Sequence, residues 1–238
     1  MSYLLLSPSS SNPKTKKSIG KGYLTPILYL APYNESGCMN VCPSSTAHCR
    51  KLCLYHCGHG GIIDKKTQTN HIRRVRITKT RMFHHDRQRF LQELNLDIEL
   101  AKKKATKKGL KLAIRLNGTS DIPFEDLPLA NGRSLMDTHN DTQFYDYTKV
   151  VKRLRKRRPK NYYLMLSYSG SNKKECVRAL EDGFNVAVIF KKGLPETLWG
   201  YKVIDGDKDD LRFLDPKGVV VGLRAKGPAR TANNKMIL

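Results

Sequence analysis

The sequence is short of acidic side chains and has no long hydrophobic run. Its 238 residues include 21 Asp and Glu against 44 Lys and Arg, which gives a formal charge of +23. No window approaches the ~18 to 20 consecutive apolar residues that a membrane span needs, and the YLLL segment near the start lacks the basic residues that open a signal peptide. We therefore expect a soluble, cytoplasmic protein without a membrane partner.

The excess of positive charge predicts an anionic partner. Self-repulsion on this scale destabilises a folded chain and is typical of proteins that bind nucleic acid. The basic residues gather in HIRRVRITKTRMFHHDRQR and in KRLRKRRPK (152–160), and Arg pairs with phosphate through two hydrogen bonds. A solvated basic surface is the alternative. We predict that nucleic acid or a nucleotide-like polyanion contacts Arg73, Arg74, Arg76, Arg81, Lys152, Arg153, Arg155, Lys156, Arg157 and Arg158.

The chain also lacks any Cys-x-x-Cys pair, although five of its six cysteines lie within the twenty positions 38–57. Structural zinc sites usually use two such pairs, and disulfides are rare in a reducing cytoplasm. An iron-sulfur cluster held by three thiolates is our first interpretation. Zinc held by four thiolates, or by thiolates with His56 or His59, is the second, and unliganded thiols are the third.

Two cysteine triplets compete for such a cluster. Cys49, Cys53 and Cys57 are each four residues apart, so they would share one face of a helix. Cys42, Cys49 and Cys53 form the other triplet, with Cys42 in a loop before that helix. Cys176 stands apart inside a helical pattern and is predicted to be a buried core residue.

A regular series of short apolar segments predicts an α/β fold. Segments such as 185–190 (NVAVIF) and 218–223 (GVVVGL) are apolar on both faces, as buried parallel strands are. Helical patterns cover about 80–108 and 172–182. Seven strands favour a complete or partial parallel β/α barrel, TIM-like, with the cysteine-rich loop after its first strand. The predicted strands are 23–30, 112–117, 143–148, 162–168, 185–190, 201–205 and 218–223.

The domain organisation predicted from composition is a single β/α domain over 23–226. Residues 1–22 are rich in Ser, Pro, Lys and Gly and have no apolar period, and 227–238 is similar. We expect a flexible basic arm and a flexible tail in these positions.

Polar residues follow the predicted strands where a β/α barrel places its active site. In such a barrel the carboxyl ends of the strands line one pocket. Ordinary loop polarity is the simpler reading of any one of these residues. We take as catalytic candidates Asn117, Ser120, Asp121, Asp146, Lys149 and Asp205.

Several motifs together resemble a family of phage and plasmid proteins, the gene product 88 family. They are LAPYNESGCMNVCPSSTAHCRKLCLYHCGHGG, RLNGTSDI, FYDYTK, NVAVIF and VIDGDKDDLRFLDPKGVVVGL, spread over about 23–227. The resemblance implies Cys42, Cys49 and Cys53 as principal ligands, whereas Cys38 and Cys57 resemble additions in this chain and are open as fourth ligands or bystanders. More distantly, the loop is similar to that of radical S-adenosylmethionine barrel proteins, although their spacing is Cys-x3-Cys-x2-Cys. This implies an iron-sulfur enzyme that uses S-adenosylmethionine and acts on nucleic acid or nucleotide.

Two other classes of function remain open from the sequence. One is a DNA- or RNA-binding protein without catalysis, in which zinc only folds the cysteine loop. The other is a nuclease or replication initiator that uses His84, His85 and Asp86, with a nearby tyrosine. The initiator class needs a His-hydrophobic-His strand, which HHDR in a helical pattern does not supply.

Overall fold

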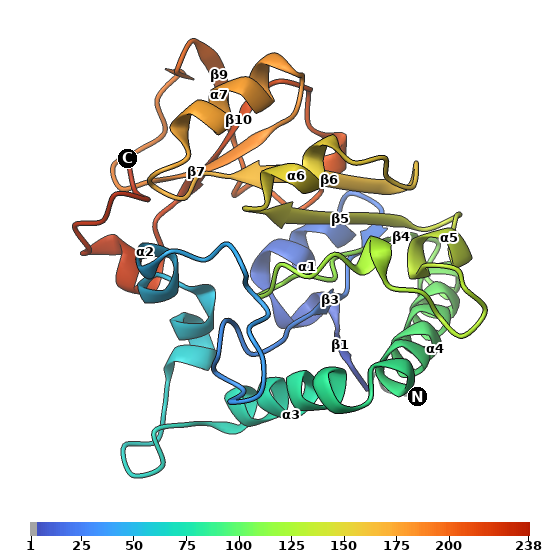
Figure 1. Cartoon of the computed structure of the whole chain (residues 1–238). Helices are drawn as coiled ribbons and strands as arrows, with labels where there is room; N and C mark the ends of the chain where they lie inside the picture. The colour runs from blue at the N-terminus through green and yellow to red at the C-terminus, as the bar shows by residue number, and fades with distance from the viewer. Residues whose placement is uncertain (1–3) are drawn as a thin grey trace.

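The computed structural model describes residues 4–238, and its centre is one eight-stranded sheet (Figure 1). The strands run in the order β2-β4-β5-β6-β7-β10-β9-β8, and all neighbours are parallel except β8 and β9. A separate antiparallel pair joins β1 (Leu6–Ser7) to β3 (Ile27–Leu28). The sheet strands are β2 (Tyr23–Leu24), β4 (Lys111–Ile114), β5 (Gln143–Thr148), β6 (Tyr162–Ser167), β7 (Val186–Phe190), β8 (Thr197–Leu198), β9 (Tyr201–Asp205) and β10 (Val220–Arg224).

Seven α-helices and six short 3-10 helices connect these strands in the described residues. The α-helices are α1 (Pro13–Ile19), α2 (Ala47–Lys51), α3 (His71–His85), α4 (Arg87–Lys107), α5 (Leu135–Thr138), α6 (Val151–Arg155) and α7 (Lys173–Glu181). The 3-10 helices are η1 (Ser9–Ser11), η2 (Leu54–His56), η3 (Gly58–Gly61), η4 (Phe124–Asp126), η5 (Arg212–Leu214) and η6 (Gly227–Arg230). Within residues 4–238, no helix is both long enough and apolar enough to cross a membrane.

The predicted α/β class with a mostly parallel sheet is confirmed, but the predicted barrel is not found. Each of the seven predicted strand segments contributes to the parallel sheet, yet the sheet does not close. The strand order reverses at one end, where β10 inserts between β7 and β9, and the antiparallel β8 forms the edge. Closure needs a continuous parallel order from first strand to last, and this reversal breaks it.

The face of the sheet that a barrel would turn inward is covered by the chain itself. Phe213 of η5 packs its ring against Tyr23 and Tyr145, with ring centroids 5.4 and 5.7 Å apart. Lys14 of α1 pairs with Asp207 at 3.2 Å, in the loop after β9. Helix α1 and the β9–β10 connection therefore occupy the space where an open barrel would hold a pocket.

Parts of the predicted flexible arm (1–22) and tail (227–238) pack against the rest of the fold, while residues 1–3 of the arm lie outside the described residues. The Asp97 carboxylate in α4 accepts hydrogen bonds from the backbone N–H groups of Leu4, Leu5 and Leu6 at 2.7 to 2.9 Å. At the other end, the Leu238 N–H donates to Ile189 O at 2.9 Å, and Ile237 pairs with Ile189 beside β7. Buried apolar residues in both segments, such as Leu6 and Met236, explain why they pack.

The predicted long helix is two helices that break at Asp86. Asp86 lies outside helical geometry, and its carboxylate accepts from the Arg89 N–H, which caps α4. The rings of Phe83 and Phe90 pack 5.2 Å apart across the break. The bend turns α3 away from the sheet (Figure 1), so that α3 lies under the cysteine segment instead of along β4.

Candidate metal centre at the carboxyl edge of the sheet

The cysteine segment begins just after β3 and lies at the edge of the sheet where the parallel strands end, here called the carboxyl edge. The loop after β4 holds Cys42 in place from the side. Asp121 N–H donates to Val41 O at 2.8 Å, and the Cys42 Sγ lies 3.6 Å from Thr119 O. The Thr119 hydroxyl in turn donates to Leu30 O at 2.6 Å. These contacts tie Cys42 to the polar loop predicted as part of a pocket.

Helix α2 supplies Cys49, and Cys53 follows just after the helix ends. Thr46 caps the helix by accepting from the Cys49 N–H at 3.1 Å. The helix ends at Lys51, and Cys53 already has extended backbone angles before η2. Because the helix stops there, Cys49, Cys53 and Cys57 do not form the helical stripe considered from their spacing.

Cys42, Cys49 and Cys53 lie close enough for their charges to interact. Burial raises the pKa of the Cys42 thiol to about 12, and the neighbouring Cys53 and Cys49 raise it further. Burial likewise raises the pKa of Cys53 to about 11, and Cys49 adds to the effect. These sulfurs come from a loop, a helix and the turn after it, and none is in a disulfide. Cys42, Cys49 and Cys53, here called the cysteine trio, therefore lie within electrostatic range of one another.

Cys38 and Cys57 have other neighbours. The Cys38 Sγ lies 3.3 Å from the Ser36 hydroxyl. The Cys57 Sγ lies 3.8 Å from both Cys53 O and Lys226 O, so it faces the C-terminal segment. As they stand, no three His, Cys, Asp or Glu side chains within residues 4–238 form a group that could hold a metal ion. Metal binding would therefore require the trio to reorient and lose its protons.

Two cations approach the trio and would offset the charge of its thiolates. Arg76 and Lys149 both act on the Cys53 thiol to favour its ionised form. The Arg76 guanidinium lies over the rings of Tyr29 and Tyr55, at 4.7 and 5.7 Å, and its Nη1 is buried without a hydrogen-bond partner. A buried N–H without an acceptor is costly. The sulfur donors and these nearby cations suit an anionic metal-thiolate group, but the three thiols are not arranged as ligands within residues 4–238.

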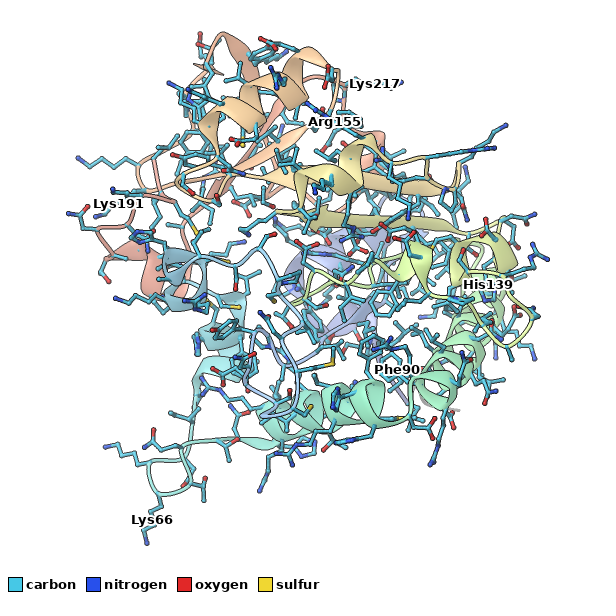
Figure 2. The ribbon with its side chains drawn as sticks, viewed as in Figure 1. Lys66, Phe90, His139, Arg155, Lys191 and Lys217 are labelled. Carbon is cyan, nitrogen blue, oxygen red and sulfur yellow. The ribbon has the colours of Figure 1, made fainter. Side chains whose placement is uncertain are left out.

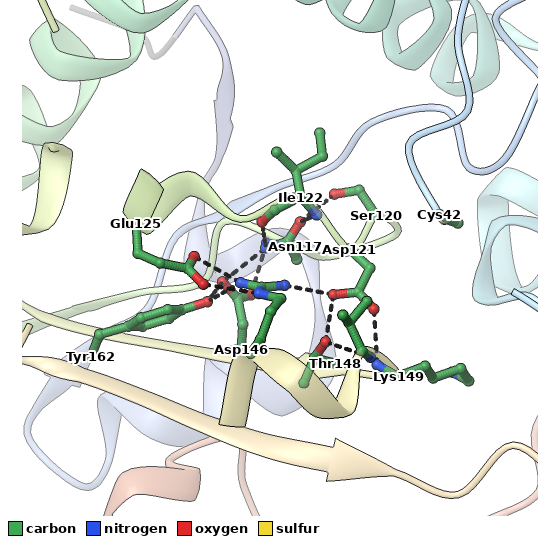
Figure 3. Close-up of polar contacts among 12 residues, drawn as sticks. Cys42, Asn117, Ser120, Asp121, Ile122, Glu125, Asp146, Thr148, Lys149 and Tyr162 are labelled. Atoms are coloured by element: carbon green, nitrogen blue, oxygen red, sulfur yellow. Dashed lines mark hydrogen bonds and ion pairs between the residues drawn. The ribbon is translucent and has the colours of Figure 1, made fainter. Parts of the chain in front are cut away.

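Three of the six predicted pocket residues, Asn117, Asp121 and Asp146, belong to a buried polar network drawn together with Cys42 in Figure 3. Arg153 donates to Asp121 at 2.6 Å and to Glu125 at 2.8 and 2.9 Å. Asp146 accepts from the Asn117 N–H at 2.7 Å and from Tyr162 at 3.2 Å. These carboxylates stabilise the core and are not open to a substrate.

Three other predicted pocket residues are placed differently. The Ser120 hydroxyl donates to Asn117 Oδ1 at 2.8 Å. Lys149 donates its backbone N–H to Asp121, while its side chain points away from the network (Figure 3). Asp205 lies at the end of β9 and pairs with Arg224 at 2.9 Å. In the sheet, β6, β7 and β10 lie between β9 and β5. The structure thus brings Asn117, Ser120, Asp121, Asp146 and Lys149 together and leaves Asp205 apart.

Two arginines of α3, Arg73 and Arg81, hydrogen-bond to backbone carbonyls in or next to the cysteine segment, although Arg81 is also exposed. Arg73 donates to Gly60 O at 2.8 Å and contacts His56 Nδ1 at 3.2 Å. Arg81 donates to Ser36 O at 3.0 Å. Arg74 is exposed. Arg73 and Arg81 therefore hold the loop that carries the cysteines, a role that a basic run in a sequence does not reveal.

The basic run 152–160 is divided between buried and exposed residues. Arg153 is 6% exposed, and its guanidinium is committed to Asp121 and Glu125, so it is not available to phosphate. Arg158 donates to the carbonyls of Arg153 and Leu154. The exposed members are Lys152, Arg155, Lys156, Arg157 and Lys160, of which Lys156 pairs with Asp126. The partner of Arg153, Glu125, has no sequence signal that would have singled it out.

His84 and His85 do not form a nuclease centre in the described part of the chain. Their rings pack against each other at 4.8 Å at the end of α3, both exposed. Neither belongs to a group of three metal-ligating side chains there.

Comparison with known proteins gives one match. A family model described as Gene product 88 matches residues 4–237, almost the whole chain. Comparisons with curated proteins and with solved structures return no match. The suggested similarity to radical S-adenosylmethionine proteins finds no support in these comparisons.

Proposed function

The chain belongs to the gene product 88 family, and on that premise we propose that it is a phage or mobile-element protein that binds an iron-sulfur cluster and acts on nucleic acid. The proposed ligands are Cys42, Cys49 and Cys53. The proposed working surface is the carboxyl edge of the sheet, where these cysteines lie.

The convergence of the three thiols is the observation that carries the proposal. Cys42 is eleven residues from Cys53 in the sequence, yet the two thiols lie near enough in the fold for Cys53 to raise the pKa of Cys42. Buried thiols are usually scattered as small core residues, whereas soft metals select grouped thiolates. Three thiolate ligands would leave one iron of a four-iron cluster open to a further ligand.

The surrounding residues of this chain would support such a site in two ways. Arg76 and Lys149 would offset the negative charge of the thiolates, which lowers the cost of ionising them in a buried place. Arg73 and Arg81 would keep the loop in position through their hydrogen bonds to Gly60 O and Ser36 O.

A nucleic-acid partner is supported by the charge of the molecule. Even if each of the 21 acidic side chains paired with a basic one, the formal charge of +23 would remain, and basic residues such as Arg74, Lys152 and Arg155 are exposed. Cations on a surface attract a phosphate backbone by releasing its condensed counterions.

Anaerobic purification tests the metal part of the proposal. The expected product is brown, with absorbance in the visible sulfur-to-iron bands and about four irons per chain. Colourless protein that carries stoichiometric zinc would contradict the iron-sulfur proposal and favour a zinc-stabilised nucleic-acid-binding protein without catalysis. Colourless protein without metal would remove the cysteine trio as a metal site.

A further inference from the structure

Six exposed cations from three separate segments gather at the carboxyl edge, next to the cysteine trio. None of them takes part in an ion pair among residues 4–238, and Glu175, next to Lys174, is exposed as well. We call this set the basic rim. Its members are Lys173, Lys174, Lys191, Lys192, Arg230 and Lys235.

The C-terminal segment joins the parts of the basic rim. Lys191 follows β7, and its N–H donates to Leu238 O at 2.7 Å. Lys235 passes over the loop before α7 so closely that a Cβ added at Gly170 would lie 3.1 Å from the Lys235 Cβ. Lys173 and Lys174 open α7 three and four residues further on. Sequence segments that are far apart therefore present one cationic surface.

The same segment packs directly on the cysteine-bearing helix. Ala229 and Met236 form an apolar cluster with Leu52, and Cys49 packs against it. The Asn234 amide donates to His48 O at 3.4 Å. Figure 2 shows Lys191 on the side of the molecule where α2 and the C-terminal segment lie. An anion bound along the basic rim would lie beside the trio.

The run 152–160 leads away from that edge. It begins after β5 and must return to the start of β6, because β5 and β6 are parallel. Lys160 accordingly lies beside Asn161, whose amide donates to the carbonyls of Met136, His139 and Thr142 at the start of β5. Of the two cationic surfaces, the basic rim therefore lies nearer to the cysteines than the run 152–160, although that run is the more prominent in the sequence.

We propose that the basic rim is the surface that binds the phosphate backbone of nucleic acid and places it against the cysteine trio. This inference rests on the proposed nucleic-acid partner and specifies where that partner binds. Lysine ammonium groups on an exposed edge suit backbone contacts that do not depend on base sequence.

The test compares two variants of the full-length protein that each remove four positive charges. One is K173Q/K174Q/K191Q/K192Q in the basic rim, and the matched control is K152Q/R155Q/R157Q/K160Q in the run. Binding of a labelled single-stranded oligonucleotide of random sequence is measured by fluorescence anisotropy over a series of salt concentrations. All eight positions are exposed, so unfolding midpoints close to that of the wild type are expected for both variants.

The rim variant should bind at least tenfold more weakly at low salt. Its slope of log K against log salt should be shallower by about 2 to 3, since each phosphate contact on a single strand contributes about 0.7. The control should keep most of the wild-type slope. Equal losses, or a larger loss in the control, would overturn the inference while leaving nucleic acid as the partner. A wild-type protein that does not bind at low salt would instead remove the partner itself.

Discussion

Arg153 shows how one residue can belong to a basic run and still serve the core. Its guanidinium lies between the carboxylates of Asp121 and Glu125. Arg153→Ala should lower the free energy of unfolding by about 3 to 5 kcal/mol, because it leaves two buried carboxylates without their counter-charge. Urea unfolding measures the loss. Arg155→Ala, at an exposed neighbouring position, is the control, and its free energy of unfolding should stay within about 0.5 kcal/mol of the wild type.

His139 should contribute to the pH dependence of stability between about pH 4 and 6.5. Desolvation and the nearby Lys102 lower its pKa to about 4, although Glu99 opposes them. The unfolded chain, with a His pKa near 6.5, binds the proton more tightly. The stability that neutral His139 provides is therefore present above about pH 6.5 and is lost as the pH falls toward 4.

The substitution His139→Gln isolates this effect. The difference in unfolding free energy between wild type and His139→Gln should shrink from pH 7 to pH 4.5 in urea titrations. A difference that stays constant would show that His139 titrates with an ordinary pKa.

At the scale of elements, the first strand depends on one side chain of a distant helix. Asp97 in α4 accepts the three N–H groups that begin β1. Asp97→Ala should therefore destabilise the protein by about 1 to 3 kcal/mol, the cost of leaving buried donors unpaired. Limited proteolysis should cut the N-terminal segment faster than in Gln92→Ala, an exposed position on the same helix. Equal cutting rates in the two variants would mean that the segment is held by its leucines alone.

At the scale of the whole molecule, the positions of the strands could be predicted from the sequence. Whether the sheet closes into a barrel could not. Runs such as 185–190 and 218–223 are apolar on both faces, and burial on both faces of a parallel sheet requires this pattern. The insertion of β10 between β7 and β9 leaves no mark in any single segment, because it depends on where the chain crosses over. The ordered ends were missed for a similar reason, since their anchors, Asp97 and Ile189, lie far away in the sequence.

The candidate site likewise has parts that could be predicted from the sequence and parts that could not. The choice of Cys42, Cys49 and Cys53 came from the family resemblance and stays a prediction, since these thiols lie within electrostatic range of one another but form no metal-ligating group within residues 4–238. Periodicity alone had left the helical triplet with Cys57 open, and the early end of α2 removes it. The basic rim was invisible in the sequence, because its lysines come in pairs too short to stand out from a chain of this charge.

The central claim is that Cys42, Cys49 and Cys53 act together as the ligands of one cluster. Iron and acid-labile sulfide per chain, measured after anaerobic purification, test it most directly in two cysteine variants. C38S/C57S should keep the wild-type content of about four irons, whereas C42S/C49S/C53S should lose nearly all of it. Iron retained by the triple variant, or lost equally from both, would contradict the account.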